Sequence, residues 1–363
     1  MNLRQTNPVA MIDDLKALVE CESPTDDLAA CHLVIDLAIE IANKVLPTPA
    51  EKVIENGRPI FWWGTKEPKI LLLCHLDTVW PKGSFKSTWN VSGDIATGPG
   101  VFDMKAGFVQ ALYSLINLED ANDKVALIAT TDEETGSATS KDLIIRLAKS
   151  SDAVLVFEAS LDGKVKTGRK GTAMYQITVT GKASHAGLEP EKGINATTEI
   201  AKLVMQISAF ENPQFGTTAV PTVMQSGTTT NTVPALAKLD IDVRSFTLAE
   251  LNRIDKSIKS LKSEIAEVEV SGGISRPPLE ESSCIELYEK LEEVAKKLGL
   301  NPVGSASVGG ASDGNIAAST GAKVLDGLGA VGTGAHAPNE SIKISAVEPR
   351  IKLTSEFIKE LLK

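Results

Sequence analysis

The feature that most constrains this chain is a set of short, continuously apolar runs that alternate with helical patterns. Three such runs lie in its first half, at residues 70–74, 125–129 and 153–157. A run without polar positions is typical of a strand covered on both faces, as in parallel sheets flanked by helices. A helical pattern at about 139–149 separates the second run from the third. The pattern therefore predicts an α/β domain with a mainly parallel sheet.

The middle of the chain has a different pattern. Strands such as Thr172–Thr180 alternate apolar and polar residues, which is typical of a sheet with one buried face. From 168 to 280 the predicted order is β-α-β-β-α-β, the ferredoxin-like pattern. We therefore predict one α/β domain, formed by residues 1–167 and 281–363, that is interrupted by an inserted ferredoxin-like domain at 168–280.

Composition excludes several classes of function. The 363 residues include 37 basic and 47 acidic side chains, a net charge of −10, which argues against a nucleic-acid partner. The apolar stretches are too short for a membrane-spanning helix, and the N-terminus lacks the apolar core of a signal peptide. None of the four cysteines forms a C-x-x-C pair. We expect free thiols and a cytoplasmic protein with no membrane partner.

Each of the three apolar runs leads into acidic or imidazole side chains. The first is followed by His75-Leu76-Asp77, the second by Glu133-Glu134, and the third by Glu158. Ligands of open α/β sheets bind beyond the carboxyl ends of the strands. We therefore expect these side chains to meet at one edge of the sheet.

Two further residues complete a candidate metal site. Asp103 follows a glycine-rich segment, and His336 lies in another near the C-terminus. Imidazole and carboxylate are ligands of Zn²⁺, whereas a cluster of three carboxylates without a cation would be repulsive. The charge of Asp103, Glu134 and Glu158 would be balanced by two divalent ions and a hydroxide.

Two acidic residues have other expected roles. Asp77 lies two residues from His75 and could accept the second imidazole N–H. Glu133 precedes a proposed ligand, so its side chain could face a metal-bound water and act as a general base.

Taken singly, each motif also has an ordinary structural explanation. A lone histidine such as His75 is commonly structural, Glu133-Glu134 could be a solvated turn, and Glu158 could be an exposed strand-end acid. The run Gly327–Gly332 fits G-x-G-x-x-G, but it lacks the acidic partner of a βαβ unit, so we reject a dinucleotide site.

Together the motifs resemble one enzyme family. The segments in question are His75-x-Asp77, Gly98-Pro99-Gly100 with Asp103-Met104-Lys105-Ala106-Gly107, Glu133-Glu134, Glu158, Gly168–Gly171, Gly181–Gly187 and Gly334–Glu340. In this order they resemble the di-zinc metallopeptidase family of acetylornithine deacetylase, succinyl-diaminopimelate desuccinylase and glutamate carboxypeptidase, with the last branch nearest. The likeness covers nearly the whole chain.

The resemblance implies a role for each residue of the metal site. Asp103 would bridge two Zn²⁺ ions, with Co²⁺ or Mn²⁺ as possible substitutes, and the peptide bond after it would be cis. His75 and Glu158 would complete one site, and Glu134 and His336 the other. Asp77 would orient His75, and Glu133 would be the general base toward a metal-bridging water.

The resemblance also implies roles for the inserted domain as a lid and as the surface of a homodimer. His185 would stabilise the oxyanion, in its own active site or in that of the partner subunit. Arg244 and Asn231 would contact the substrate, and the glycine loop with Gly310 would lie near the substrate carboxylate.

The expected function is hydrolysis of a peptide or N-acyl amide bond next to a free carboxylate, as in the glutamate carboxypeptidases. A deacylase of N-acyl amino acids is the nearer alternative. A metal-binding protein without catalytic activity is the more distant one.

Overall fold

The computed structural model describes residues 8–116, 118 and 121–363, and it divides into two compact units. Unit 1 comprises Met1–Gly168, Glu281–Ser307 and Ser312–Lys363. Unit 2 comprises Arg169–Glu280 together with Val308–Ala311, a segment that the sequence analysis assigns to the other domain. The first seven residues of the predicted 1–167 segment lie outside the described residues.

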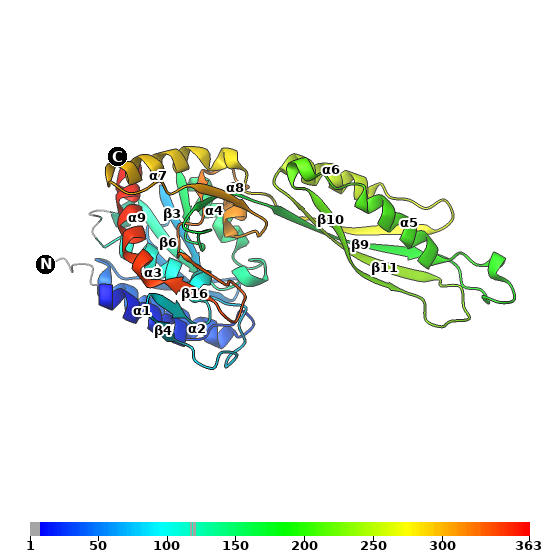
Figure 1. Ribbon diagram of the computed structural model, residues 1–363, viewed down its shortest axis with the longest axis horizontal. Coiled ribbons are helices and arrows are strands. Elements are labelled where there is room, and N and C mark those ends of the chain that lie inside the picture. Colours follow the sequence, from blue (N-terminus) through cyan, green and yellow to red (C-terminus); the bar gives the residue numbers. More distant parts are fainter. Residues whose placement is uncertain (1–7, 117, 119–120) are drawn as a thin grey trace. The chain divides into compact units, whose positions relative to one another are not determined.

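Unit 1 is built on a six-stranded sheet with the order β1-β2-β6-β3-β7-β14 (Figure 1). The pairs β3–β6, β3–β7 and β7–β14 are parallel, which confirms the predicted mainly parallel sheet. The strands are β1 (Glu51–Glu55), β2 (Arg58–Gly64), β3 (Ile70–His75), β6 (Val125–Thr130), β7 (Ala153–Val156) and β14 (Val324–Leu325).

The antiparallel hairpin of β1 and β2 was not among the predicted strands. Asn56 and Gly57 connect the two strands, with φ angles of 46° and 84°. An Asn-Gly pair with two positive φ angles is the usual two-residue hairpin turn, so the sequence did contain a signal for it.

Helices cover the sheet of unit 1, and the hydrophobic core of the unit lies between the sheet and these helices. Leu72, Leu127 and Leu155 belong to one large buried cluster with residues of α1, α2, α3, α7 and α9. Burial of one leucine side chain contributes about 1.5–3 kcal/mol to folding. The helices of unit 1 are α1 (Pro8–Glu20), α2 (Leu28–Val45), α3 (Ala106–Ser114), α4 (Lys141–Ser150), α7 (Ile285–Lys297), α8 (Asp313–Ala318) and α9 (Val347–Leu361). Among the described residues, no helix combines the length and the apolar character that a membrane crossing requires.

A second, small sheet of unit 1 connects distant parts of the chain. Its order is β15-β16-β5-β4, and all its pairs are antiparallel. The strands are β4 (Asn90–Ser92), β5 (Ile95–Thr97), β15 (Gly332–Thr333) and β16 (Ser341–Lys343). Strands of two or three residues are too short to show a periodic pattern, so the sequence did not predict this sheet.

Unit 2 has the predicted order of elements. Its strands form a four-stranded antiparallel sheet, β10-β11-β9-β12, and its two helices pack on that sheet (Figure 1). Alternate residues of β9, such as Tyr175, Ile177 and Val179, are buried in the core of the unit. The elements are β9 (Gly171–Thr180), α5 (Ala196–Ser208), β10 (Thr218–Ser226), β11 (Leu236–Ser245), α6 (Leu248–Lys259) and β12 (Glu267–Arg276). Outside both larger sheets, β8 (Val165–Arg169) pairs with β13 (Ser305–Val308).

Candidate metal centre

Three neighbouring parallel strands deliver side chains to one edge of the central sheet. β3 ends at His75, β6 is followed by the turn Glu133–Thr135, and Glu158 comes two residues after β7. Because β3 lies between β6 and β7, their carboxyl ends are adjacent.

Asp103 reaches this edge from a sharp turn. Gly100 has a φ of 71°, and a Cβ at this position would lie 2.4 Å from Cγ2 of Thr78, so only glycine fits. The Asp103–Met104 peptide bond is cis, as the resemblance implied.

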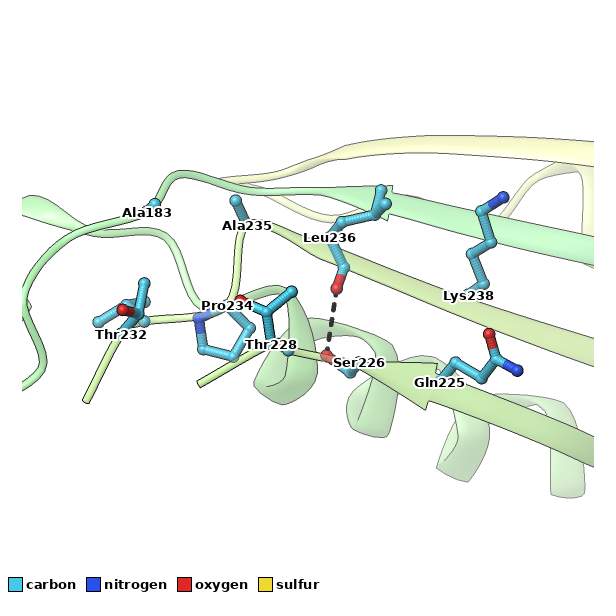
Figure 2. Close-up of a pocket in the computed structure, with 11 residues that line it drawn as sticks. Ala183, Gln225, Ser226, Thr228, Thr232, Pro234, Ala235, Leu236 and Lys238 are labelled. Atoms are coloured by element: carbon cyan, nitrogen blue, oxygen red, sulfur yellow. Dashed lines mark hydrogen bonds between the residues drawn. The ribbon is translucent and has the colours of Figure 1, made fainter. Parts of the chain in front are cut away.

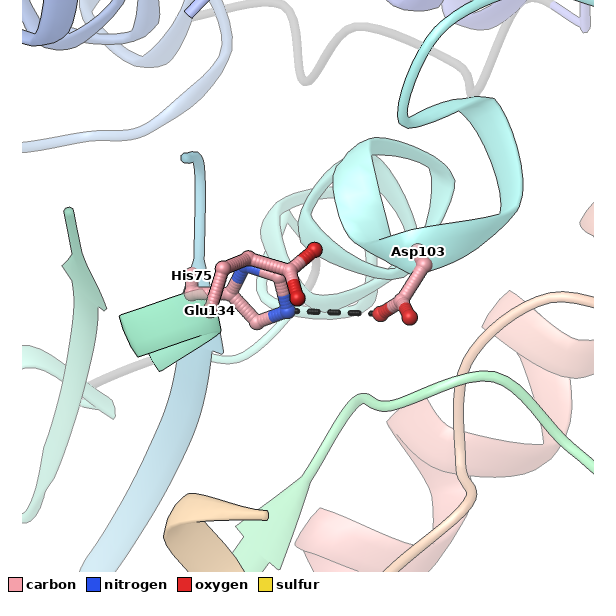
Figure 3. Close-up of side chains that lie close together, drawn as sticks. All are labelled: His75, Asp103 and Glu134. Atoms are coloured by element: carbon pink, nitrogen blue, oxygen red, sulfur yellow. Dashed lines mark hydrogen bonds and ion pairs between the residues drawn. The ribbon is translucent and has the colours of Figure 1, made fainter. Parts of the chain in front are cut away.

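The two histidines contact the carboxylates directly. Nε2 of His75 lies 3.3 Å from Oδ1 of Asp103 and 3.6 Å from Oε1 of Glu158. Figure 3 shows the His75 ring and the Asp103 carboxylate pointing toward one another, with Glu134 beside the ring. Nε2 of His336 lies 3.0 Å from Oε2 of Glu134 and 3.5 Å from Oδ2 of Asp103. Asp103 thus lies within 3.5 Å of both imidazoles.

Asp77 is fully buried and fixes its surroundings through several contacts. Its Oδ2 accepts hydrogen bonds from the Thr25 hydroxyl at 2.8 Å and from the backbone N–H of Glu134 at 3.2 Å. The backbone N–H of Glu133 donates to Oδ1 at 3.4 Å. Nδ1 of His75 lies 3.1 Å from the backbone oxygen of Asp77 and 3.4 Å from its Oδ1. Asp77 therefore links the imidazole to the turn that carries Glu133 and Glu134.

The ionisation of these groups reflects their proximity. Burial alone would lower the pKa of His75, but hydrogen bonds with Asp103, Asp77 and Glu158 raise that pKa well above its usual value. Hydrogen bonds with Asp103 and Glu134 raise the pKa of His336 to about 10. Burial would raise the pKa of Asp103, yet the two imidazoles hold it below its ordinary range. The carboxylates thus favour positive charge at this point, which is the electrostatic requirement of a cation site.

The donor atoms are also close enough to share metal ions. Ligand atoms of His75, Asp103 and Glu134 lie within 4.8 Å of one another, and so do those of His75, Glu133 and Glu158. Imidazole nitrogen and carboxylate oxygen suit Zn²⁺, Mn²⁺ and Co²⁺. The residues therefore fit a divalent metal centre. Glu133 belongs to one of these groups, although the sequence analysis expects it to be a base and not a ligand.

Two residues at this site had no role in the sequence analysis. Thr25 donates to Asp77, and the buried Glu340 accepts a hydrogen bond from the backbone N–H of Asp103 at 3.0 Å. The position of Glu340 in the same motif as His336 was the available signal. Nothing in the local pattern around Thr25 pointed to the site.

The other predicted residues lie in unit 2. His185 is exposed, and its Nδ1 accepts hydrogen bonds from the N–H groups of Gly187 and Leu188, both at 3.1 Å. This leaves the proton of the neutral ring on Nε2. The backbone oxygen of Asn231, also an exposed residue, accepts the N–H of Ala186 and so holds the His185 loop.

Arg244 is paired with a carboxylate of its own strand. Its Nε and Nη2 donate to the two oxygens of Asp242 at 2.9 and 3.2 Å, and its Nη1 lies 3.5 Å from the backbone oxygen of Gly309. Gly310, next in the same loop, accepts a hydrogen bond at 3.2 Å from Nη1 of Arg169. Two arginines therefore contact the glycine loop within unit 2.

A pocket of about 340 Å³ in unit 2 is lined by Ala183 and by residues between 225 and 238 (Figure 2). Its lining includes Thr232, which pairs with His185 in a short bridge, and Lys238 at its far side. Beside the pocket, the Ser226 hydroxyl at the end of β10 donates a hydrogen bond to the backbone oxygen of Leu236 at the start of β11, at 3.3 Å. No predicted metal ligand lines this pocket.

Comparison with known families identifies the chain. The model of Peptidase family M20/M25/M40 matches residues 71–360, a range that includes every residue of the metal centre described above except Thr25. The chain belongs to this family. The family resemblance seen in the sequence is thereby confirmed, and this M20 protein is a metallopeptidase-type hydrolase.

The M20 protein has relatives of two kinds. Carboxypeptidase G2 of Pseudomonas sp. (strain RS-16) is 33% identical, over 97% of this chain and 89% of the relative. Succinyl-diaminopimelate desuccinylase of Pelagibacter ubique (strain HTCC1062) is 25% identical, over 82% of this chain and 83% of the relative.

Solved structures show the same fold. Aminopeptidase PepT from Bacillus cereus ATCC 10987 has a TM-score of 0.79 at 21% identity, covering 98% of this chain and 99% of its own. The Bacillus subtilis YXEP protein, described as a dinuclear metal binding peptidase from the M20 family, has a TM-score of 0.70 at 14% identity, covering 96% and 97%. At these identities the likeness shows that the M20 fold is shared.

Proposed function

We propose that this M20 protein is a metal-dependent hydrolase that cleaves a peptide or N-acyl amide bond next to a free carboxylate, in the manner of a glutamate carboxypeptidase. One observation carries the proposal: Asp103 lies within 3.5 Å of both imidazoles, with Glu158 3.6 Å from His75 and Glu134 3.0 Å from His336. The 33% identity with carboxypeptidase G2 supports the choice of substrate class.

Two divalent cations fit this set of ligands, and we propose Zn²⁺ as the native metal. Asp103 would contact both ions, His75 and Glu158 one of them, and Glu134 and His336 the other. When bound, the metal pair polarises the scissile carbonyl and makes the attacking water more acidic.

Glu133 is the proposed general base. Its backbone N–H and that of Glu134 are both fixed on Asp77, so the two neighbouring carboxylates are presented from one rigid turn. Glu133 would accept a proton from the attacking water and later transfer it to the leaving amine.

The inserted domain would supply the substrate contacts. The hydrogen bonds to Nδ1 of His185 leave an Nε2–H that can donate to an oxyanion. Arg244, whose Nη1 lies 3.5 Å from the backbone oxygen of Gly309, would bind a substrate carboxylate beside the loop with Gly310. Asn231 would contact the substrate next to His185. The lid role of this domain is part of the same proposal.

A deacylase of N-acyl amino acids is the second candidate. The relatives named succinyl-diaminopimelate desuccinylase support it, because they match most of the chain. Both candidates require the same metal centre and differ in the acyl group that is removed. A cytoplasmic location is also part of this proposal.

A hydrolysis panel tests the proposed function. The metal-stripped protein and the same protein restored with Zn²⁺ are assayed on dipeptides and acyl-glutamates, on acetyl- and succinyl-amino acids, and on versions with an amidated C-terminus. We expect zinc-dependent release of C-terminal glutamate and little cleavage of the amidated substrates. Preferred release of acetate or succinate would select the deacylase, and no hydrolysis of any substrate would reject both candidates.

The substitution Glu133→Ala tests the general base. We expect kcat to fall by about 10²–10⁴-fold while the metal content stays at the wild-type value, because only proton transfer is lost. The matched control is Glu289→Ala, which removes an exposed glutamate from α7. Steady-state kinetics and elemental analysis are the measurements, and wild-type turnover in Glu133→Ala would contradict the assignment.

A further inference from the structure

We propose that Glu340 is a positioning residue that holds Asp103 in the orientation needed to bind metal. The inference rests on the proposed function, since Asp103 is there the ligand shared by both ions. The carboxylate of Glu340 points into the turn that carries Asp103.

The carboxylate of Glu340 is fully buried and accepts four hydrogen bonds. Oε1 accepts the backbone N–H groups of Phe102 and Asp103, at 2.9 and 3.0 Å. Oε2 accepts the backbone N–H of Gly100 at 3.0 Å and the indole N–H of Trp80 at 2.8 Å. Three of the four donors thus belong to the backbone of residues 100–103, and one of them is the N–H of Asp103.

The small sheet explains how this contact arises. In the pairing of β16 with β5, Ser341 lies opposite Thr97, so Glu340 lies next to the start of the Gly98–Asp103 segment. The same short connection between β15 and β16 carries His336. Glu340 therefore joins the loop of one proposed ligand to the loop of another, across 237 positions of the sequence.

The chemistry of the acceptor gives the contact its specificity. Both oxygens of a carboxylate accept hydrogen bonds, so all four N–H donors have a partner. A glutamine of the same shape has one oxygen and one NH₂ group. Two of the four N–H donors would then face this NH₂ group, which is itself a donor. The turn would then shift to relieve the conflict, and the Asp103 carboxylate would shift with it.

The substitution Glu340→Gln tests the inference with Co²⁺ alone as the probe. Metal-free protein is titrated with Co²⁺, and the visible absorption of the bound ion reports both affinity and ligand geometry. We expect the affinity for Co²⁺ to fall by about 10–100-fold, the usual effect of losing a group that orients a ligand, with an altered absorption spectrum.

A matched pair of tryptophan variants separates positioning from general stability. Trp80→Phe removes one donor to Glu340, whereas Trp63→Phe removes an indole donor that bonds the backbone oxygen of Thr48, at 3.1 Å. We expect Trp80→Phe to weaken Co²⁺ binding and change its spectrum, and Trp63→Phe to leave both as in the wild type even where it lowers the melting temperature.

The outcomes distinguish this inference from the proposed function. If the wild type binds Co²⁺ and Glu340→Gln binds it with the same affinity and spectrum, the positioning role is wrong and the metal centre stands. If Glu340→Gln does not fold, Trp80→Phe decides, and Co²⁺ binding equal to that of Trp63→Phe overturns the inference. A wild-type protein that binds no Co²⁺ overturns the proposed function and this inference with it.

Discussion

Gln110 is a buried polar side chain whose amide group has no hydrogen-bond partner among the described residues. It lies on α3 with only 1% of its surface exposed, next to apolar residues such as Val109 and Ala111 that belong to the main core. Within the described residues, neither its amide oxygen nor its amide nitrogen has a hydrogen-bond partner. A buried polar group without a partner costs about 1–3 kcal/mol of stability.

Replacing Gln110 with methionine should therefore stabilise the protein. Methionine has a similar length and no polar group to satisfy, so we expect Gln110→Met to raise the melting temperature measured by scanning calorimetry. Gln206→Met is the matched control, because Gln206 is exposed on α5 and its replacement should change little. A Gln110→Met protein that is less stable than the wild type would show that the amide is satisfied in solution.

At the scale of elements, one partly buried hydrogen bond joins a strand to a helix in unit 2. The hydroxyl of Tyr175 on β9 donates to Oδ1 of Asp255 on α6 at 2.9 Å, and Asp255 also pairs with Lys259 at 2.8 Å. Burial and the neighbouring carboxylate raise the pKa of Tyr175 above its ordinary value. The neutral phenol is therefore the form that this packing requires.

This contact predicts a pH dependence of stability. Because the folded-state pKa lies above that of a free tyrosine, about 10, the contribution is complete below pH 10 and is lost as pH rises toward the folded-state value. The loss can reach about 1.4 kcal/mol per pH unit for one group. We expect urea unfolding at about pH 9 and about pH 11 to show a larger loss for the wild type than for Tyr175→Phe. Equal losses would remove Tyr175 as the cause.

At the scale of the whole molecule, we propose a homodimer formed through the inserted domain. β10 is an edge strand of the unit 2 sheet, and its Val220, Val223 and Met224 are 44%, 50% and 52% exposed. Exposed apolar residues on an edge strand favour pairing with another strand. In a two-fold symmetric dimer the same edge strand of a second copy would offer the same apolar side chains and the same free backbone groups for pairing.

Sedimentation of the wild type and two lysine variants tests the dimer. We expect the wild type to sediment at twice the chain mass of 38.5 kDa and Val223→Lys to sediment as a monomer, because a charged edge resists pairing. Ile54→Lys is the control. Ile54 is 52% exposed on β1, an edge strand of the six-stranded sheet in unit 1, and this variant should remain a dimer. A monomeric wild type would contradict the proposal.

The sequence by itself determined the central strands β3, β6 and β7, the places where they end, and the order of elements in the inserted domain. These depend on burial patterns within a few residues, and strand ends in a parallel sheet meet at one edge whatever the loops do. For this reason His75, Glu134 and Glu158 could be grouped before the structure was known. The Asn56-Gly57 pair is also a local signal, for the turn of the β1–β2 hairpin, although that hairpin was not predicted.

Only the tertiary structure decided which distant groups face each other. The bond between Glu340 and the Asp103 turn depends on the pairing of two strands of three residues each, and no local pattern encodes such a pairing. The same holds for the two contacts of Arg244, one with Asp242 on its own strand and one with the distant Gly309 loop. Hydrogen bonds of this kind form wherever folding brings donor and acceptor together, so their partners follow from the packed chain and not from spacing along it.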